Sequence, residues 1–378
     1  MARIMWACWD GGGNLTPSIG IATVLEARGH TVHFFGRPDM VGRVEAAGLA
    51  ATELTDAYAD LNRYSFHPLA TVFGYTSSPA VGKELVARAS AYEPDVVVID
   101  AMFASALNVA TRFDRPTAVM LHTFFDHLID MWRSNFAMQS ASRQKAGFDA
   151  LPDLDTLWGE RDNFHVNALK AFECEPTVSW PNVVHGAPVL HAERRAVRTE
   201  LRWDESDPTP LVLLSFSTVP EQRDPAMLQA ALDALGQLPV HVVATTGGIV
   251  DPADLNAPAN AHLVPFADHD ALMERACMVV GHGGHGTTMR ALSHGLPMVG
   301  IPAKGADQGP ITQLLEQWKV GRALPGDTGA DEIRAAADEV LTNSVYGEQA
   351  RQRSLAFAGR DGAQLAADSV ESLLPVAG

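Results

Sequence analysis

The sequence has few cysteines and few basic residues. Three of its 378 residues are cysteine, at positions 8, 174 and 277, and no CxxC pair occurs. This argues against both a disulfide framework and a structural zinc site. Lys and Arg number 28 against 45 Asp and Glu, so the formal net charge is -17. Because nucleic-acid phosphates are bound mainly by Lys and Arg, we expect no nucleic-acid partner.

The sequence also lacks a long apolar run. No stretch approaches the roughly 18 residues that span a bilayer, and the N-terminal MARIMWACW has no signal-peptide core. We therefore expect a cytoplasmic protein without stable membrane insertion. With 47% hydrophobic residues, the chain is long enough for two domains of ordinary size.

Short apolar runs alternate with helical stretches in both halves of the chain. This alternation, with nearly continuous apolar strands, predicts an α/β fold with parallel doubly wound sheets. We expect two Rossmann-like domains that face each other across a cleft, with ligands at the carboxyl ends of the strands. The expected strands are RIMWACW, HTVHFFG, DVVVID and PTAVMLH, then LVLLSFST, VHVVATTG, HLVPF, ACMVVGHGG and LPMVGIP.

A charged, proline-ended segment separates the two halves and predicts an interdomain linker at residues 196–209. The expected domains are residues 1–195, which would bind an acceptor, and 210–354, which would bind a donor. The C-terminal helix within 355–378 is expected to pack back on the first domain.

A glycine-rich turn follows the predicted strand ACMVV and leads directly into a helix. Glycines at such a junction let backbone N–H groups point at an anion, and the helix dipole adds about half a positive charge there. Gly284, His285, Gly286 and Thr287 are placed to receive a phosphate. His282 lies just ahead and can donate a ring N–H to the same phosphate.

Asp307 and Gln308 follow the next predicted strand. An acid beside an amide suits the vicinal hydroxyls of a sugar, so the two motifs together predict a nucleotide-sugar site. The alternative is a tight strand-to-helix turn with solvated histidines.

This region resembles the glycosyltransferases of the GT-B fold, family 1, and is most similar to bacterial enzymes that glycosylate macrolides, polyketides and other natural products. The family signature is His-Gly-Gly-x-Gly-Thr, then Ala-Leu, Gly-x-Pro and Asp-Gln. SFST, Ser215 to Thr218, stands in place of the family's serine/threonine turn. The matching residues are His282, Gly283, Gly284, Gly286, Thr287, Ala291, Leu292, Gly295, Pro297, Asp307 and Gln308.

The resemblance implies an inverting, metal-independent enzyme. It would transfer a sugar, typically a deoxysugar, from a dTDP or UDP donor to a hydrophobic aglycone, with no cofactor besides this co-substrate. His269 replaces a frequent family glutamine, and Arg290 stands where plant members carry a glutamate. Phe266 would stack on the nucleobase in place of a tryptophan. The donor-binding residues it implies are Ser217, Thr218, Phe266, His282, Gly284, His285, Gly286, Thr287, Asp307 and Gln308.

The loop CWDGGGNLTP follows the first strand, where the family usually carries Gly-His-x-x-Pro with a catalytic histidine. Asn14 takes the position of that histidine, and an amide cannot accept a proton at neutral pH. The family's second catalytic residue matches Asp100. A dinucleotide fingerprint fails because Thr16 stands where a third glycine is required, and no Gly-Lys-Ser/Thr of a phosphate loop occurs.

Several residues at strand ends of the first domain are candidates for the general base. Asp100 is the first choice, with Asn14 orienting the acceptor hydroxyl, and His122 is the second. Asp10 is a third candidate, although it could simply cap the turn, and Asp126 is a fourth. An acidic phenol or an electron-rich ring carbon as acceptor needs no strong base, so a mechanism without a strong general base also stays open.

The acceptor site is expected in the rest of the first domain. Gly12 and Gly13 would lie under the acceptor without side-chain bulk, and aromatic residues could line an apolar pocket or simply form core. Asp153-Leu154-Asp155 is interpreted as a chance match, so no metal site is expected. A homodimer, a non-catalytic helper protein and a nucleotide-sugar epimerase of GT-B fold stay open. The aromatic candidates for the acceptor pocket are Phe66, Phe73, Trp132 and Phe136.

Overall fold

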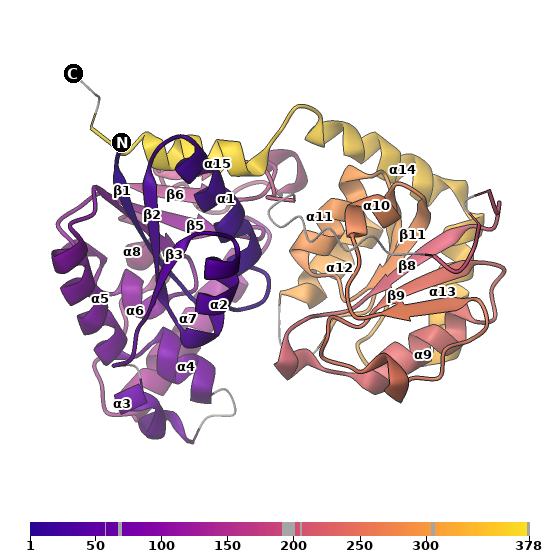
Figure 1. The fold of residues 1–378 in the computed structure, drawn as a ribbon, viewed down its shortest axis with the longest axis horizontal. Helices are drawn as coiled ribbons and strands as arrows, with labels where there is room; N and C mark the ends of the chain where they lie inside the picture. The colour runs from indigo at the N-terminus through magenta and orange to yellow at the C-terminus, as the bar shows by residue number, and fades with distance from the viewer. Residues whose placement is uncertain (57, 67–69, 191–200, 205, 304–306, 376–378) are drawn as a thin grey trace. The chain divides into compact units, whose positions relative to one another are not determined.

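The computed structural model describes residues 1–375 except 57, 67–69, 191–200, 205 and 304–306. The chain forms two compact units: Met1–Glu193 with Arg360–Gly378, and Arg194–Gly359. Both units are parallel-sheet α/β domains (Figure 1). Of the predicted linker at 196–209, residues 196–200 and 205 lie outside the described part of the chain.

The first unit is built on a seven-stranded parallel sheet with the order β3-β2-β1-β4-β5-β6-β7. Its central strands are buried on both faces, which explains their continuous apolar sequences. The strands are β1 (Arg3–Cys8), β2 (Thr31–Gly36), β3 (Ala50–Glu53), β4 (Val96–Asp100), β5 (Thr117–Leu121), β6 (Asn163–Val166) and β7 (Val183–His185).

Helices flank this sheet, and α1 ends just before Gly29, whose φ of 89° is typical of a C-terminal glycine. The helices are α1 (Leu15–Ala27), α2 (Pro38–Ala46), α3 (Tyr58–Leu61), α4 (Ala70–Thr76), α5 (Pro79–Tyr92), α6 (Ala104–Leu107), α7 (Ile129–Lys145), α8 (Leu154–Gly159) and α15 (Gly362–Glu371).

The C-terminal helix α15 packs on α1 in the first unit (Figure 1). Its small apolar residues join the core formed by β1, β2 and α1. Arg28, the C-cap residue of α1, donates to Asp368 and Glu371, each at 2.7 Å, and His30 Nε2 lies 2.9 Å from Glu371. Helix α15 therefore covers α1, the helix that begins in the loop CWDGGGNLTP after β1.

Trp158 of α8 is the centre of an aromatic cluster in the first unit. Its side chain is fully buried, and its Nε1 donates to the Ala101 carbonyl at 2.9 Å. Its ring neighbours are Phe125, Trp132, Phe136, Phe164 and Trp180.

We expect Trp158→Ala to lower the free energy of unfolding by about 3–5 kcal/mol, because the substitution leaves a cavity in this cluster. Chemical denaturation measures the loss. Trp158→Phe should cost less, since it keeps most of the ring packing. A loss below about 1 kcal/mol for the alanine variant would show that the cluster contributes little to stability.

The second unit is built on a six-stranded parallel sheet with the order β10-β9-β8-β11-β12-β13. Helices α9 and α13 pack against each other over its main hydrophobic core. The strands are β8 (Leu211–Ser215), β9 (His241–Thr245), β10 (Ala261–Val264), β11 (Ala276–Gly281), β12 (Met298–Gly300) and β13 (Gly321–Ala323). The helices are α9 (Pro225–Leu235), α10 (His269–Met273), α11 (His285–Ser293), α12 (Gln308–Gln317), α13 (Ala330–Thr342) and α14 (Ser344–Ser354).

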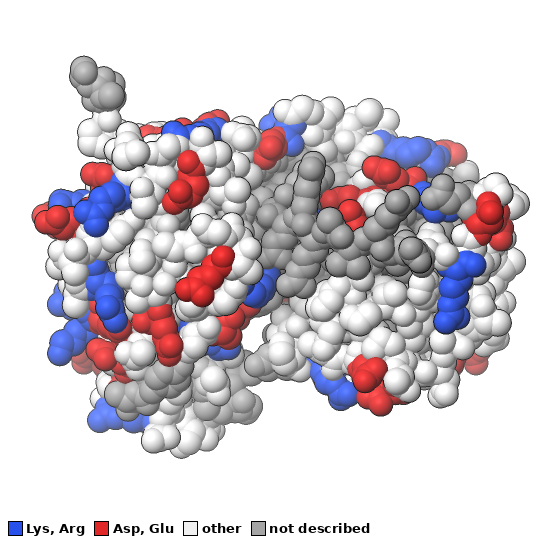
Figure 2. Space-filling view, viewed as in Figure 1, with Lys and Arg blue, Asp and Glu red and all other residues white. Residues whose placement is uncertain are grey.

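Acidic and basic side chains are interspersed over the visible surface of each unit (Figure 2). Within the described residues, no helix has the length and apolar character needed to cross a bilayer.

Candidate active site

The loop after β1 is held by Asp10 and Asn14. Asp10 accepts a hydrogen bond from the Gly12 backbone at 2.9 Å and pairs with Arg43 at 2.7 Å. Gly12 has a φ of 86°, which a glycine adopts without strain. The carboxylate of Asp10 thus serves the turn and an ion pair, which agrees with its expected capping role.

Asn14 connects this loop to the end of β4. Its Oδ1 accepts from the Gly11 backbone at 2.8 Å, and its Nδ2 donates to the Trp9 carbonyl at 2.9 Å and to Asp100 Oδ2 at 3.0 Å. A Cβ on Gly11 would lie 3.0 Å from the Trp9 ring, so the loop packs tightly here. The structure therefore brings together the two residues that match the family's catalytic pair.

Asp100 is 2% exposed and accepts three hydrogen bonds, from Asn14, from Trp9 Nε1 at 3.1 Å and from the Met102 backbone at 3.0 Å. Burial raises the pKa of this carboxyl to about 6, although the three hydrogen bonds act in the opposite direction. Asp100 is therefore ionised at pH 7, but it is a stronger base than an exposed aspartate.

His122 belongs to the same polar network. Its Nδ1 lies 3.2 Å from Asn167 Nδ2, and its Nε2 lies 3.1 Å from Ser18 Oγ, which donates to the Asn14 carbonyl at 2.8 Å. With the amide of Asn167 placed this way, Nδ1 accepts and Nε2 carries the proton. Because both ring nitrogens already have partners, the geometry favours Asp100 over His122 as the base.

Asp126 lies in a different cluster, which also contains residues that the sequence analysis missed. Its side chain is 1% exposed and pairs with Lys170 at 2.6 Å, and His185 Nε2 lies 3.4 Å away. Burial raises the pKa of the neighbouring Glu173 to about 7. Asp126, Glu173 and His185 have the geometry of a metal-ligand group, but the Lys170 ammonium already neutralises Asp126. Asp126 is therefore a poor candidate for the general base.

Asp153, in the predicted chance match, caps α8 by accepting from the Thr156 backbone at 2.8 Å. Its neighbour Asp155 pairs with Arg133 at 3.0 Å. Both acids of this stretch thus have structural partners.

The aromatic residues predicted to line the acceptor pocket differ in exposure. Phe73, Trp132 and Phe136 are 4%, 4% and 2% exposed, whereas Phe66 is 39% exposed with the Lys145 ammonium 4.4 Å from its ring centroid. Three of the four therefore belong to the packed core, which was the alternative to a pocket lining. An acceptor role for these residues, and for Gly12 and Gly13, stays a prediction.

The glycine-rich turn of the second unit lies between β11 and α11. Gly283 has a φ of 72°, and a Cβ there would lie 2.2 Å from Thr312 Cγ2. A Cβ on Gly284 would lie 2.5 Å from His282 Nε2. These glycines let α12 and the His282 ring approach the backbone closely, while a Cβ on Gly286 would meet no atom within 4 Å. Thr287 follows in the first turn of α11.

The two histidines of the turn are neutral at physiological pH. Burial lowers the pKa of His282 to about 4 and that of His285 to about 3. Nδ1 of His282 has no hydrogen-bond partner in the described part of the chain. The ring also has a hydrogen bond with the Ser215 backbone. A neutral imidazole has a single N–H, so His282 can donate at most one hydrogen bond and brings no positive charge.

His282 lines a pocket at the carboxyl ends of β8, β9, β11 and β12. Polar residues on its wall include Ser217, Gln222 and Arg223, and apolar ones include Phe216, Met227 and Ile301. Ser217 Oγ accepts from the Val219 backbone at 3.1 Å, and Thr218 is exposed beside it. The Ser-Thr turn and the glycine-rich turn thus end at the same edge of the sheet.

Gln308 is 5% exposed and has a fixed orientation. Its Oε1 accepts from the Ala303 backbone at 2.9 Å, and its Nε2 donates to Gln222 Oε1 at 2.9 Å. Asp307 occupies the N-cap position of α12. Gln222 was not predicted from the sequence, where its one signal is its position five residues after Ser217.

The expected nucleobase side of the site centres on Phe266, which is 40% exposed. Its ring lies against the turn formed by Gly247 and Gly248, and a Cβ on Gly248 would lie 2.9 Å from Phe266 Cζ. His269 lies 3.2 Å from Thr245 Oγ1, and burial lowers its pKa to about 4. Arg290 pairs with Asp270 at 3.4 Å. His269 and Arg290 thus have structural partners in the second unit.

The buried histidines predict an acid-sensitive fold. Histidines with a lowered folded-state pKa stabilise the fold fully above their unfolded pKa of about 6.5, and this stability is lost as the pH falls toward 4. Asp100 and Glu173, whose pKa values are raised, have the opposite effect, but they are fewer. The histidines with a pKa of about 4 or lower are His165, His269, His282 and His285.

We expect the free energy of unfolding to fall by several kcal/mol between pH 7.5 and pH 5, because each such histidine loses about 2 kcal/mol by pH 5. Urea titrations at several pH values measure this dependence. His165 is fully buried, and neither ring nitrogen has a hydrogen-bond partner among the described residues. His165→Leu should therefore reduce the loss of unfolding free energy between pH 7.5 and pH 5. An unchanged loss would contradict this explanation.

The second unit matches a known protein family. Residues 229–364 match the family model described as erythromycin biosynthesis protein CIII-like, C-terminal domain. A demethyllactenocin mycarosyltransferase from Streptomyces fradiae is 24% identical, over 99% of this chain and 87% of the relative. A PGL/p-HBAD biosynthesis glycosyltransferase from Mycobacterium tuberculosis is 31% identical, over 49% of this chain and 42% of the relative.

Solved structures share the complete fold. The calicheamicin glycosyltransferase CalG4 superimposes with a TM-score of 0.77 at 22% identity, and the alignment covers 100% of both chains. The glycosyltransferase VinC, solved in complex with DTDP, gives a TM-score of 0.73 at 16% identity over 98% of both chains.

The two parallel-sheet α/β domains, with a glycine-rich turn in the second, have the GT-B fold. Within this fold, most of the second unit matches the erythromycin biosynthesis protein CIII-like C-terminal domain, and the relatives described above are glycosyltransferases.

Proposed function

We propose that this enzyme transfers a deoxysugar from a dTDP-sugar to a hydrophobic natural-product aglycone, with inversion and without a metal ion. The relatives support the donor class. One is named a mycarosyltransferase, a structural neighbour is a spinosyn rhamnosyltransferase, and two neighbours were solved with thymidine diphosphate. UDP is the second candidate carrier.

The observation that carries the proposal is the buried Asp100, held by Asn14 at the end of β4. A carboxylate has about four acceptor sites, and Asp100 uses three of them. One site is left to accept the proton of an acceptor hydroxyl, and a pKa of about 6 suits a general base at neutral pH. Asn14 would hold Asp100 and orient the acceptor in place of the family's histidine.

The second unit would bind the donor. The first backbone N–H groups of α11, the ring N–H of His282 and the hydroxyls of Ser217 and Thr287 are the donors available to the diphosphate. Such preorganised dipoles stabilise charge that develops on a leaving group. A single displacement, with the acceptor opposite the leaving diphosphate, inverts the anomeric carbon. Asp307 and Gln308 would contact the sugar hydroxyls.

Calorimetric titration with dTDP and with UDP, in the presence of EDTA, tests the donor assignment. We expect micromolar binding of dTDP. If neither nucleotide binds, the donor assignment is wrong. Retention of the anomeric configuration, measured by NMR on a product, would contradict inversion, and loss of turnover in EDTA would contradict metal independence.

The relatives and neighbours described above are transferases, so a helper protein or an epimerase is not favoured. Conversion of the donor sugar without any acceptor would support an epimerase. A homodimer stays a prediction, which light scattering tests.

A further inference from the structure

The leaving diphosphate poses a charge problem for this site. A nucleoside diphosphate carries at least two negative charges, and the chain itself has a formal net charge of -17. The histidines of the glycine-rich turn are neutral at pH 7. The helix N-terminus supplies only about half a positive charge. A cation from elsewhere in the second unit would make departure of the diphosphate easier.

Among the described residues that line the pocket with His282, Arg223 is the one Lys or Arg. It follows a 3-10 turn at Pro220–Gln222, between the Ser-Thr turn and α9. Its Nε donates to the Ile249 carbonyl at 2.7 Å, which anchors the guanidinium to the loop after β9. The same loop carries Gly247, which lies against Ser217 and Thr218, and Gly248, which lies against Phe266.

Arg223 also differs in its pairing from three other arginines of its unit, Arg290, Arg322 and Arg334. Arg290 and Arg322 form ion pairs with acidic side chains, whereas Arg223 forms none within the described residues. An arginine has five N–H donors, and one of them is used on Ile249. Asp224 lines the pocket too, but its carboxylate accepts from the Met227 backbone at 3.0 Å and caps α9.

We infer that Arg223 is a catalytic residue that binds the donor diphosphate and neutralises the charge that it gains as it leaves. In the step, the bond from the anomeric carbon to the phosphate oxygen breaks, and its electron pair stays on the diphosphate. The acceptor oxygen bonds to the anomeric carbon, and its proton passes to Asp100. The inference rests on the proposed nucleotide-sugar donor.

A charge series at position 223 tests this role: Arg223→Lys, Arg223→Gln and Arg223→Glu, with dTDP and uncharged thymidine as calorimetric probes. We expect Arg223→Gln to weaken dTDP binding about 10- to 100-fold and to lower kcat, since a charge-assisted hydrogen bond is lost. The lysine variant should lose less and the glutamate variant more. Thymidine binding should stay within about twofold.

Arg334→Gln is the matched control, because it removes a charge from α13, whose Arg334 pairs with Asp331 outside the pocket. It should leave the dissociation constant of dTDP unchanged. If Arg223→Gln binds dTDP like the wild type, the inference is overturned while the proposed function stands. If the lysine variant loses as much as the glutamate variant, the side chain acts as an anchor and its charge is not used, which also overturns the inference. If the wild type binds neither dTDP nor UDP, the proposed nucleotide-sugar donor is wrong, and the role of Arg223 falls with it.

Discussion

Asp100→Asn is expected to lower kcat about 10²- to 10⁴-fold, the range typical of a lost general base, while dTDP binds as it does to the wild type. The amide cannot take the proton of the acceptor. All three groups that contact this carboxylate are hydrogen-bond donors, so one of them would face the new amide N–H. Thermal unfolding must therefore accompany the kinetics.

The pH profile gives an independent measure of the same residue. The pKa of Asp100 is raised to about 6, so kcat/KM should decline as the pH falls through 6 and the base becomes protonated. This limb should be absent from the residual activity of Asp100→Asn.

Asp10→Asn is the matched control, because it makes the same change in the loop that Asn14 ties to Asp100. Asp10 is committed to Gly12 and Arg43, so its loss should affect stability more than kcat. If Asp10→Asn or His122→Ala abolishes turnover and Asp100→Asn does not, Asp100 is not the base.

His282→Ala is expected to lower kcat about 10²- to 10³-fold, as removal of one preorganised donor to a developing anion does in other enzymes. It should also weaken dTDP binding. His282→Gln retains an N–H and should recover part of the loss. Because the pKa of His282 is about 4, this residue should add no pH dependence between pH 6 and 8.

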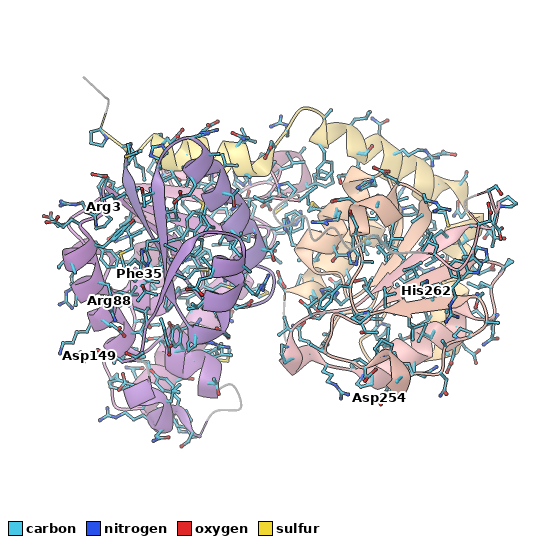
Figure 3. The ribbon with its side chains drawn as sticks, in the orientation of Figure 1. Arg3, Phe35, Arg88, Asp149, Asp254 and His262 are labelled. Atoms are coloured by element: carbon cyan, nitrogen blue, oxygen red, sulfur yellow. The ribbon has the colours of Figure 1, made fainter. Side chains whose placement is uncertain are left out.

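His262→Ala is the control for this substitution. His262 lies on β10, is labelled in Figure 3, and is not among the pocket-lining residues. It should keep wild-type dTDP binding and kcat. If His282→Ala behaves like His262→Ala, the phosphate-binding role of the glycine-rich turn is wrong.

Much of the fold could be predicted from local patterns. Buried parallel strands need continuous apolar residues, and the expected strand DVVVID became β4. Strand β6 was not among the expected strands. Its four residues are too short to show a period, and their strand conformation depends on pairing with β5.

The candidate site was partly accessible from sequence. Gly283 and Gly284 could be recognised because close backbone approach leaves a glycine signal. Glu173, Gln222 and Arg223 could not, since a single Glu, Gln or Arg in a loop has no pattern. Their significance comes from neighbours distant in the chain, such as Asp126, Gln308 and Ile249.

By itself the sequence determined that this protein has two parallel α/β domains and a glycine-rich turn after β11, because periodicity and glycine placement are local properties. The tertiary structure alone decided that Asn14 holds Asp100, that Trp132 and Phe136 are core residues, and that His282 is neutral. Hydrogen-bond partners, burial and pKa values depend on groups that only the folded chain brings together.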